Sequence, residues 1–554
     1  MIVFESFLSS GSFIFLLSVV ALFLYAEIHY KPRFLRGLLY RKRPEIIFDV
    51  PQRIQTTELP VALIIKDSHK FPVYIKNVKI EILQSSQILN TFTYKENQSV
   101  VSLFFSKLYT LDVKSYTGSY LEIKCTLDYR IKSKNRSVVN NNYPFLKPKN
   151  MSVYIDPDKR PLESEWKWGD VHCHSHYTED QVEFGLPLKL FPELGKATGM
   201  SFAAITDHSY DLDDGHDSWT GVDPDLAKWH NMQKEVSELN SKSSNFTLLP
   251  GEEVSTDNGK GKTVHMVVIN PDKFYPGCGD SFEKGVFQKS KLRVDQILSD
   301  LNGKAIAFAA HPFEKPSLVQ NIFLNRDVWN TEDSHSKLAG FQIVNGKRME
   351  AFRIGKKEWV KKLLQKQRKY IYAGNDSHGF LNRFISIHAP LISLNNSEGH
   401  IFSEMLTAVR DVDQNVESIT QGLKQNPVII SSGPFLNISI KNSEAKDNNQ
   451  PRLFARPNEI AHIGETLEGK PDTLKITAKS TNFFGKIDQI KSYISNYEGN
   501  QEVLINTYNT NSLHFEKELS LTNLPWQGYI RSELTTRKGN FALTNPVWFE
   551  EQKS

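Results

Sequence analysis

The chain has 554 residues, of which 39% are hydrophobic and 23% charged, and its formal net charge is +4. This length predicts three or four folding units, and this composition excludes bulk disorder, collagen-like repeats and a polytopic membrane protein. So small a net charge gives no general sign of nucleic-acid binding, and the three cysteines are too few and too scattered for a disulfide framework.

An uncharged apolar segment of membrane length extends from residue 7 to residue 26. At about 1.5 Å per residue, a helix over this segment spans about 30 Å, the thickness of one bilayer core. No basic residue precedes it and no small-residue cleavage site follows it, which favours an uncleaved anchor over a cleaved signal peptide or a buried helix. Six basic residues follow between 31 and 43. We therefore expect a single-pass membrane protein whose catalytic region lies in the cytoplasm.

Three regions follow this anchor and basic segment of residues 1–43. Residues 44–157 and 440–554 contain short alternating strands separated by turn-prone polar stretches, which predicts two β-sandwich-like domains. The first of them contains no cluster of reactive residues and is interpreted as a spacer or interaction module. From 163 to 438, seven apolar runs of strand length alternate with helical patterns. That alternation is typical of an α/β domain with a parallel sheet, and seven strands predict a barrel.

Ionisable residues lie at or near the ends of most of these runs. In a β/α barrel the carboxyl ends of the strands surround one mouth, so residues far apart in sequence would converge there. Imidazole and carboxylate groups are ligands for zinc, manganese or iron, and residues i and i+2 of a strand share a face. The candidates are His172, His174, Asp207, His208, Glu253, His265, His311, Asp376 and His378. A lone strand-end histidine is usually a hydrogen-bonded core or surface residue, but so many in one region favour a shared metal site.

The motifs GDVHCHSH, ITDH, GEE, a strand histidine, AAHP and GNDSHG, in this order, resemble those of the polymerase and histidinol phosphatase (PHP) family. The resemblance covers about residues 163–438 and implies a distorted seven-stranded barrel with two or three divalent metal ions. The C-terminal motifs SSGPFLNISI, HIGETLEG, YIRSEL and LTNPVWFE resemble the terminal β-domain of the PHP branch that includes a carbamate-ester hydrolase.

The resemblance also implies a place for each ligand. It assigns His172 and His174 to a first metal with Asp376 alongside, His265 and His311 to a second, His208 and His378 to a third, and Glu253 to a bridge between two metals. The position six residues after His174 is Asp180, where some family members have histidine. The third metal depends on this position, and Glu179 is a rival ligand.

Two further residues are candidate catalytic groups. Asp207 precedes a ligand histidine and is expected to orient a ligand or a water molecule, or to handle a proton. Arg383 follows the last ligands in the stretch GFLNRF. It is expected to hold a substrate anion through two hydrogen bonds, with a plain surface arginine as the alternative.

Two cations a few ångströms apart lower the pKa of a water molecule between them and stabilise charge on the electrophile. We therefore expect a membrane-anchored, metal-dependent phosphoesterase whose metal-bridging hydroxide hydrolyses a small phosphomonoester, a phosphodiester or the end of a nucleic acid. A carboxylic- or carbamic-ester hydrolase on the same metals is the first alternative, and a non-catalytic membrane-anchored binding protein is the second. The sequence indicates no particular protein partner.

Overall fold

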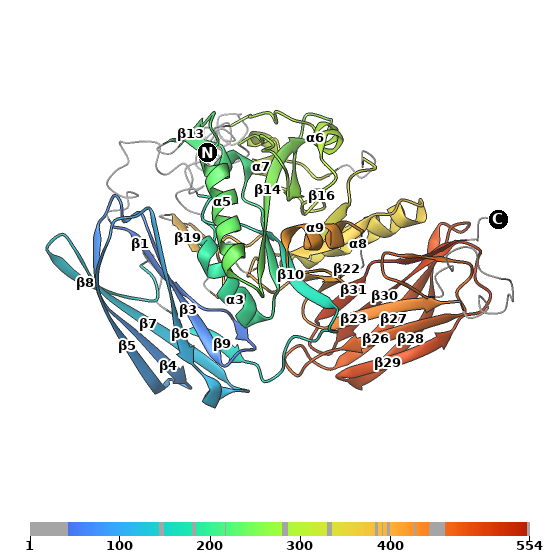
Figure 1. Ribbon diagram of the computed structural model, residues 1–554, viewed down its shortest axis with the longest axis horizontal. Helices are drawn as coiled ribbons and strands as arrows, with labels where there is room; N and C mark the ends of the chain where they lie inside the picture. The colour runs from blue at the N-terminus through green and yellow to red at the C-terminus, as the bar shows by residue number, and fades with distance from the viewer. Residues whose placement is uncertain are drawn as a thin grey trace, which may run out of the picture.

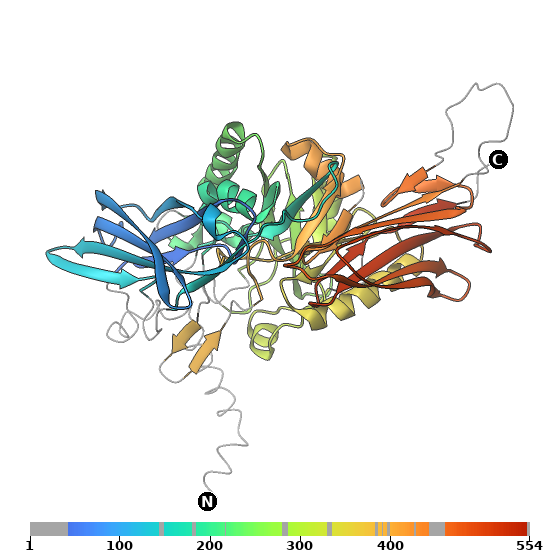
Figure 2. The same cartoon turned by 90° about the horizontal axis from the view of Figure 1, so that it is seen from below.

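The computed structural model describes residues 43–142, 149–179, 184–215, 218–279, 286–329, 335–382, 386–389, 392–395, 399–425, 428–442 and 460–550. Three parts lie side by side along the longest axis: blue N-terminal strands, a green and yellow middle part with helices, and orange to red C-terminal strands (Figure 1). Seen from below, the two strand-rich parts lie on opposite sides of the middle part (Figure 2). Of the described residues, 46% lie in strands and 16% in helices, so the protein is predominantly β.

The N-terminal part is built from two facing sheets. One has the strand order β1-β3-β6, and the other has the order β2-β9-β7-β4-β5 with β8 paired to β7. The strands are β1 (Glu45–Asp49), β2 (Arg53–Ile54), β3 (Glu58–Lys66), β4 (Val73–Gln84), β5 (Gln87–Val100), β6 (Phe104–Asp112), β7 (Tyr120–Ile131), β8 (Lys134–Val139) and β9 (Met151–Ile155). Side chains from both sheets, such as Leu63 and Ile80, are fully buried in a common core, as in other two-sheet packings.

Strand β3 is buried on both of its faces. Val61, Leu63 and Ile65 belong to the N-terminal core, whereas Ala62 and Ile64 belong to a core that continues into the middle part. This position explains why the strand is an almost unbroken apolar run instead of an alternating one. The N-terminal part is therefore joined to the middle part by a buried apolar layer.

The seven apolar runs of the middle part form strands. They are β10 (Trp166–Cys173), β11 (Phe202–Ile205), β14 (Thr247–Asp257), β15 (Thr263–Ile269), β16 (Ile306–Ala309), β17 (Gly340–Asn345) and β18 (Tyr370–Gly374). The helices are α3 (Phe191–Thr198), α4 (Ser209–Leu212), α5 (Ala227–Lys242), α6 (Val294–Asp300), α7 (Leu318–Phe323), α8 (Met349–Leu364) and α9 (Val416–Gln425). Helix α5 buries Trp229, Met232 and Val236, which are spaced to share one face. Two short pairs, β12 (Asp214–Gly215) with β13 (Ser218–Val222) and β19 (Ser386–Ala389) with β20 (Ile392–Asn395), complete this part.

The predicted α/β fold with a seven-stranded barrel is wrong. Residues in strands outnumber those in helices by 46% to 16%, and in the hydrogen-bonded order β18-β17-β16-β15-β14-β11-β10 strand β15 is antiparallel to both neighbours. The physical reason is local, because residues 258–262 alone join β14 to β15, and a parallel return would need a crossover of a dozen or more residues. Beyond β10 the same sheet continues antiparallel through β21 (Leu406–Arg410) and β22 (Val428–Ser431) into the C-terminal strands.

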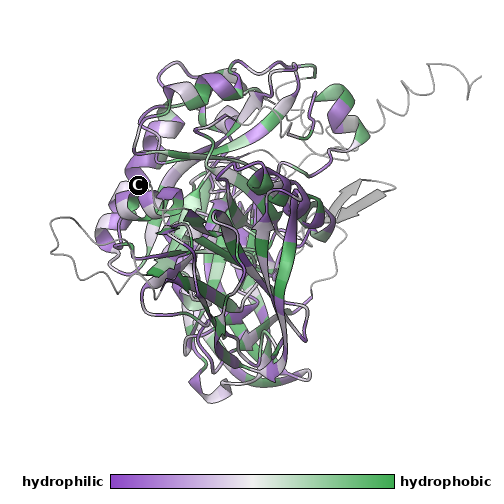
Figure 3. Cartoon of the chain, turned by 90° about the vertical axis from the view of Figure 1, so that its right-hand side faces the viewer, coloured by the Kyte–Doolittle hydropathy of each residue, from purple (hydrophilic) through white to green (hydrophobic). Residues whose placement is uncertain are grey.

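The C-terminal part also has two sheets. The long sheet ends in the order β31-β30-β27-β28, and the other sheet has the order β24-β23-β26-β29. The strands are β23 (Phe435–Lys441), β24 (Ile460–His462), β25 (Thr466–Glu468), β26 (Thr473–Lys479), β27 (Ile487–Asn496), β28 (Gln501–Ser512), β29 (His514–Ser520), β30 (Gly528–Thr536), β31 (Phe541–Thr544) and β32 (Val547–Glu550). Apolar and polar residues follow one another in short steps along these ribbons (Figure 3), as in β23, whose alternate residues are buried.

The membrane placement expected from the sequence also needs correction. Across the described ranges, no helix is long and apolar enough to cross a membrane. The expected anchor at residues 7–26 lies outside the described residues. The described part of the chain thus gives no support to a single-pass membrane protein with a cytoplasmic catalytic region, and we do not retain that assignment.

Candidate metal centre

Two chain segments that are far apart in sequence pair at the end of β10. The backbone N–H of Asp376 donates to the carbonyl of His172 at 2.9 Å, and the N–H of His174 donates to the carbonyl of Ser377 at 3.0 Å. This pairing brings His172 and His174 beside Asp376 and His378, the candidate ligands that follow β18. As a result, Nε2 of His174 lies 3.0 Å from Oδ1 of Asp376.

The carboxylate of Glu253 lies at the centre of the cluster and is fully buried. Its Oε1 lies 2.7 Å from Nδ1 of His265 and 2.9 Å from Nε2 of His311. Its Oε2 lies 2.9 Å from Nδ1 of His208 and 3.5 Å from Nε2 of His172. Each oxygen of Glu253 therefore faces a different set of imidazoles.

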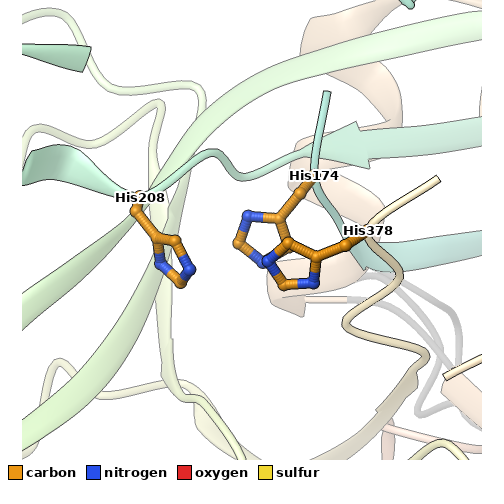
Figure 4. Close-up of side chains that lie close together, drawn as sticks. All are labelled: His174, His208 and His378. Carbon is orange, nitrogen blue, oxygen red and sulfur yellow. The ribbon is translucent and has the colours of Figure 1, made fainter. Parts of the chain in front are cut away.

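The side chains form three groups, and within each group the ligand atoms lie within 4.8 Å of one another. The groups are His174, His208 and His378; His172, His174, Glu253 and Asp376; and Glu253, His265 and His311. In the first group the ring of His208 is turned toward the rings of His174 and His378 (Figure 4). His174 and Glu253 each belong to two groups. The protein thus contains a buried His/Glu/Asp cluster that could bind metal ions.

The chemistry of the donor atoms fits a divalent metal. Nε2 of His172 and Oε2 of Glu253 are buried in the cluster and have no hydrogen-bond partner among the described residues. Leaving such a buried polar atom unpaired costs about 1–3 kcal/mol, and more for a charged group. Imidazole nitrogen and carboxylate oxygen are the donors that zinc, manganese and iron accept in proteins. A bound cation would therefore satisfy both atoms.

Opposite charges inside the cluster shift the pKa values of its members. Burial by itself lowers the pKa of His172, but the carboxylates of Glu253 and Asp376 outweigh it and raise this pKa to about 9. Burial would raise the pKa of Glu253, but His265 and other nearby imidazoles hold it well below its usual value. Against a similar burial effect, interactions with His172 and a hydrogen bond from His174 lower the pKa of Asp376. Both carboxylates are thus ionised at neutral pH, as metal ligands must be.

Two amide side chains of β17, those of Gln342 and Asn345, orient His172 and Asp376 through hydrogen bonds. Oε1 of Gln342 lies 2.7 Å from Nδ1 of His172 and accepts a hydrogen bond from that nitrogen, so that in the neutral ring Nε2 would be the atom free to bind a cation. Nε2 of Gln342 donates to Oδ1 of Asn345 at 3.1 Å, and Nδ2 of Asn345 donates to Oδ2 of Asp376 at 3.2 Å. Sequence reasoning missed both residues. Two amide side chains inside the fully buried run GFQIVN were the available signal.

Asp207 is fully buried beside the cluster and holds the loop that follows His174. Its carboxylate accepts hydrogen bonds from N–H and Oγ of Ser175, each at 2.6 Å, and from N–H of Thr178 at 3.0 Å. Oγ1 of Thr178 in turn lies 3.1 Å from Nδ1 of His174. The contacts of Asp207 are those of a positioning residue, and its expected role in proton transfer stays a prediction.

Two residues expected at the site, Asp180 and Arg383, lie outside the described residues. Glu179, the rival of Asp180, is described but belongs to none of the three groups of potential ligands.

A cleft of about 310 Å³ opens onto the cluster. Three cationic side chains line it together with the ligands: Lys315, Arg326 and Arg348. Nε of Arg348 donates to Nε2 of His400 at 3.1 Å, and the guanidinium also forms an ion pair with Glu314. Arg348 is therefore fixed from two sides at the cleft. None of these five residues was expected at the site from the sequence, because their spacing forms no motif.

No family model and no curated protein matches the chain. Similar solved structures include a β-glucuronidase of Bacteroides uniformis, at 9% identity and a TM-score of 0.16, covering 91% of this chain and 61% of that chain. A putative β-galactosidase from Bacteroides fragilis has 8% identity and a TM-score of 0.18, covering 92% and 74%. A β-glucuronidase of Parabacteroides merdae has 10% identity and a TM-score of 0.16, covering 92% and 64%. The chain thus spans less than two thirds of both glucuronidases, and TM-scores this low establish neither a shared fold nor a shared activity.

Proposed function

We propose that the protein is a metal-dependent phosphoesterase that hydrolyses a small phosphomonoester, a phosphodiester or the end of a nucleic acid. The observation that supports this proposal is a buried cluster of three overlapping groups of potential ligands, which opens onto a cleft whose lining includes three cationic side chains. We further propose that two or three divalent ions occupy the groups, and that the chemistry is that of the PHP family, whose motifs the ligand sequence resembles.

In this proposal, different residues bind the metal ions, orient a ligand and bind the substrate phosphate. When bound, divalent ions would activate water for attack and neutralise charge on the phosphoryl oxygens. Glu253 and Asp376 would supply the negative charge that holds the ions, and Gln342, through its hydrogen bond with Nδ1, would leave Nε2 of His172 to bind one of them. Arg348 is positioned to bind a non-bridging phosphate oxygen, since a guanidinium fixed in place binds phosphate with high geometric specificity.

With metal bound, the charge of the cleft would favour a phosphate over a neutral ester. Lys315, Arg326 and Arg348 line the cleft beside the carboxylates of Glu253, Glu314, Asp327 and Asp376. Divalent ions in the cluster would shift this balance of charges toward attraction of an anionic substrate. A carboxylic or carbamic ester is the second candidate, because Tyr210, Trp329 and Phe380 also line the cleft and would accept an apolar acyl or aryl group. The two classes share the metal site and differ in their need for the cations.

A substrate screen with a charge variant tests the proposal. The full chain, loaded with Mn²⁺ or Zn²⁺, is assayed with p-nitrophenyl phosphate, bis-p-nitrophenyl phosphate, single-stranded DNA ends and p-nitrophenyl acetate. Arg348→Ala should raise KM for the phosphate esters by about 10-fold, the value of one lost charge-assisted hydrogen bond. Arg353→Ala is the control, because Arg353 is an exposed residue of α8, the helix that begins just after Arg348. Turnover of only the acetate ester, insensitive to Arg348→Ala, would favour the second candidate.

A further inference from the structure

The segment that follows the ligands Asp376 and His378 is held by a carboxylate from the N-terminal part. Asp49, the last residue of β1, is fully buried. Its Oδ2 accepts a hydrogen bond from the backbone N–H of Leu381 at 3.0 Å, and its Oδ1 accepts one from the N–H of Asn382 at 3.0 Å. A span of 332 residues separates Asp49 from Leu381, so the contact exists only in the folded protein.

A second contact joins the same two parts. The side-chain Nδ2 of Asn382 donates to the backbone carbonyl of Ser152, just after the start of β9. Leu381 is buried in the apolar core to which Ile47 and Ile64 of the N-terminal sheet also belong. The segment 381–382 is therefore held by hydrogen bonds whose partners in the N-terminal part come from β1 and β9, and Leu381 is buried in the core shared by the two parts.

The ligand segment has a backbone that needs such support. Asp376 has a φ of 51° and Gly379 a φ of 70°, both in the left-handed region. A non-glycine residue there costs of order 1–3 kcal/mol and persists only where the surrounding structure holds it. The segment is held at both ends, by backbone hydrogen bonds with β10 at Asp376 and by Asp49 at residues 381–382.

We propose that Asp49 is a positioning residue of the metal centre, and that the N-terminal β part is a structural component of that centre and not a separate spacer. The carboxylate of Asp49 fixes the end of the ligand segment, which sets the directions of Asp376 and His378. Burial of a carboxylate is costly unless its oxygens accept hydrogen bonds, and here two of the donors are backbone groups of the ligand segment. The inference requires that the cluster binds metal but is independent of the substrate.

The test is metal affinity in Asp49→Asn, which keeps the shape of the side chain but removes its charge and one acceptor oxygen. Asp156→Asn is the matched control, because Asp156 is a buried carboxylate of the same part that pairs with Arg53. We titrate the metal-free full chain with Co²⁺ and follow the visible absorption of the bound ion. Asp49→Asn should weaken Co²⁺ binding by 10- to 100-fold, as removal of residues that orient ligands commonly does, and should alter the spectrum. Asp156→Asn should leave both unchanged.

Circular dichroism and thermal unfolding of the metal-free proteins separate this effect from a general loss of stability. If Asp49→Asn fails to fold, Asn382→Ala replaces it, since that change removes the bond to Ser152 from the opposite side and should also weaken Co²⁺ binding. Unchanged affinity and spectrum in a folded Asp49→Asn, or in Asn382→Ala where the first variant does not fold, would overturn the proposal. So would an equal loss of affinity in Asp156→Asn. Failure of the phosphoesterase assay with normal Co²⁺ binding would instead count against the proposed function.

Discussion

Glu252 and Glu253 are neighbours in β14, but their side chains point to opposite faces of the strand and have different partners. Glu253 faces the imidazoles of the cluster, whereas Oε1 of Glu252 accepts a hydrogen bond from the N–H of Tyr275 at 2.9 Å. Burial raises the pKa of Glu252 well above its ordinary value, while the pKa of Glu253 is lowered. Both side chains are fully buried, so their different partners and not their exposure distinguish them.

Glutamine substitutions at these two positions therefore form a matched pair. Glu253→Gln should remove more than one metal ion per chain and lower turnover by more than about 100-fold, because it removes a charge shared by two ligand groups. Glu252→Gln should retain the bound metal and the turnover, since the environment of Glu252 already favours an uncharged side chain. Metal content is measured by mass spectrometry beside turnover, with circular dichroism as the folding control. Loss of metal in Glu252→Gln alone would place the ligand at the other residue.

The raised pKa of His172 predicts that metal binding depends on pH. With a pKa of about 9, its ring is protonated on both nitrogens, and so positively charged, at pH 7.5 in the metal-free protein. A metal ion requires the neutral ring, so binding should release about one proton at this residue. Affinity should therefore rise with pH and level off above about pH 9. Calorimetry in buffers of different ionisation enthalpy measures the protons released, and affinity that is constant from pH 6.5 to 9 would contradict the expectation.

At the scale of elements, close contact between β10 and β18 sets the position of His172, a candidate metal ligand. A Cβ atom placed on Gly374, the last residue of β18, would lie 2.8 Å from Cβ of His172 and 3.1 Å from Nε2 of Gln342. Real Cβ atoms do not approach this closely, so only glycine allows the two strands to approach to this separation. The ligand and the residue that orients it are thus both sensitive to this one position.

Gly374→Ala should displace His172 and destabilise the protein by about 1–3 kcal/mol, as overpacking of a core does. It should also weaken metal binding, because the ligand itself has to move. Gly303→Ala is the control, since a Cβ there would have no neighbour within 4 Å. Denaturant unfolding and a metal titration are compared for both variants. Normal metal affinity in Gly374→Ala would show that neighbouring segments move in place of His172.

The sequence predicts some elements well and others poorly, for physical reasons. The runs that became β10 to β18 are buried and rich in branched residues, so their strand character is a local property. The direction of β15 follows from the short connection 258–262, which is a local signal that becomes readable once the ends of β14 and β15 are known. The pairing of β22 with β31 depends instead on which strand edge remains open, and no local pattern indicates that. The cluster residues stand in recognisable motifs, whereas Arg348 and Asp49 reach the site from distant segments. Only the fold shows what they contact.

On the scale of the whole molecule, one apolar core includes residues of all three parts. Ile47 of the N-terminal part, Trp168 of the middle part and Leu436 of the C-terminal part all belong to it, and each is at most 1% exposed. Burial of such side chains stabilises a protein by about 1.5–3 kcal/mol each. The three parts are therefore expected to unfold as a unit.

A fragment of residues 163–554 tests this expectation. It lacks the N-terminal sheet and would expose the apolar surface that covers Ile47 and Ile64, so it should aggregate or unfold at a lower temperature than a chain of residues 44–554. Light scattering and calorimetry compare the two. A soluble fragment with an unchanged unfolding temperature and full metal binding would show that the middle and C-terminal parts fold independently of the N-terminal part.

The continuous sheet limits how such a protein can be recombined with others. Strand β22 has β21 on one side and β31 on the other, and their ladders run antiparallel on both sides. A gene fusion that cuts the chain just after residue 442 would leave β22 with a full row of unpaired backbone N–H and C=O groups. Exposed edges of this kind invite pairing between molecules. Exchange of the C-terminal part by genetic shuffling would therefore succeed only where the incoming segment also supplies a strand for that edge.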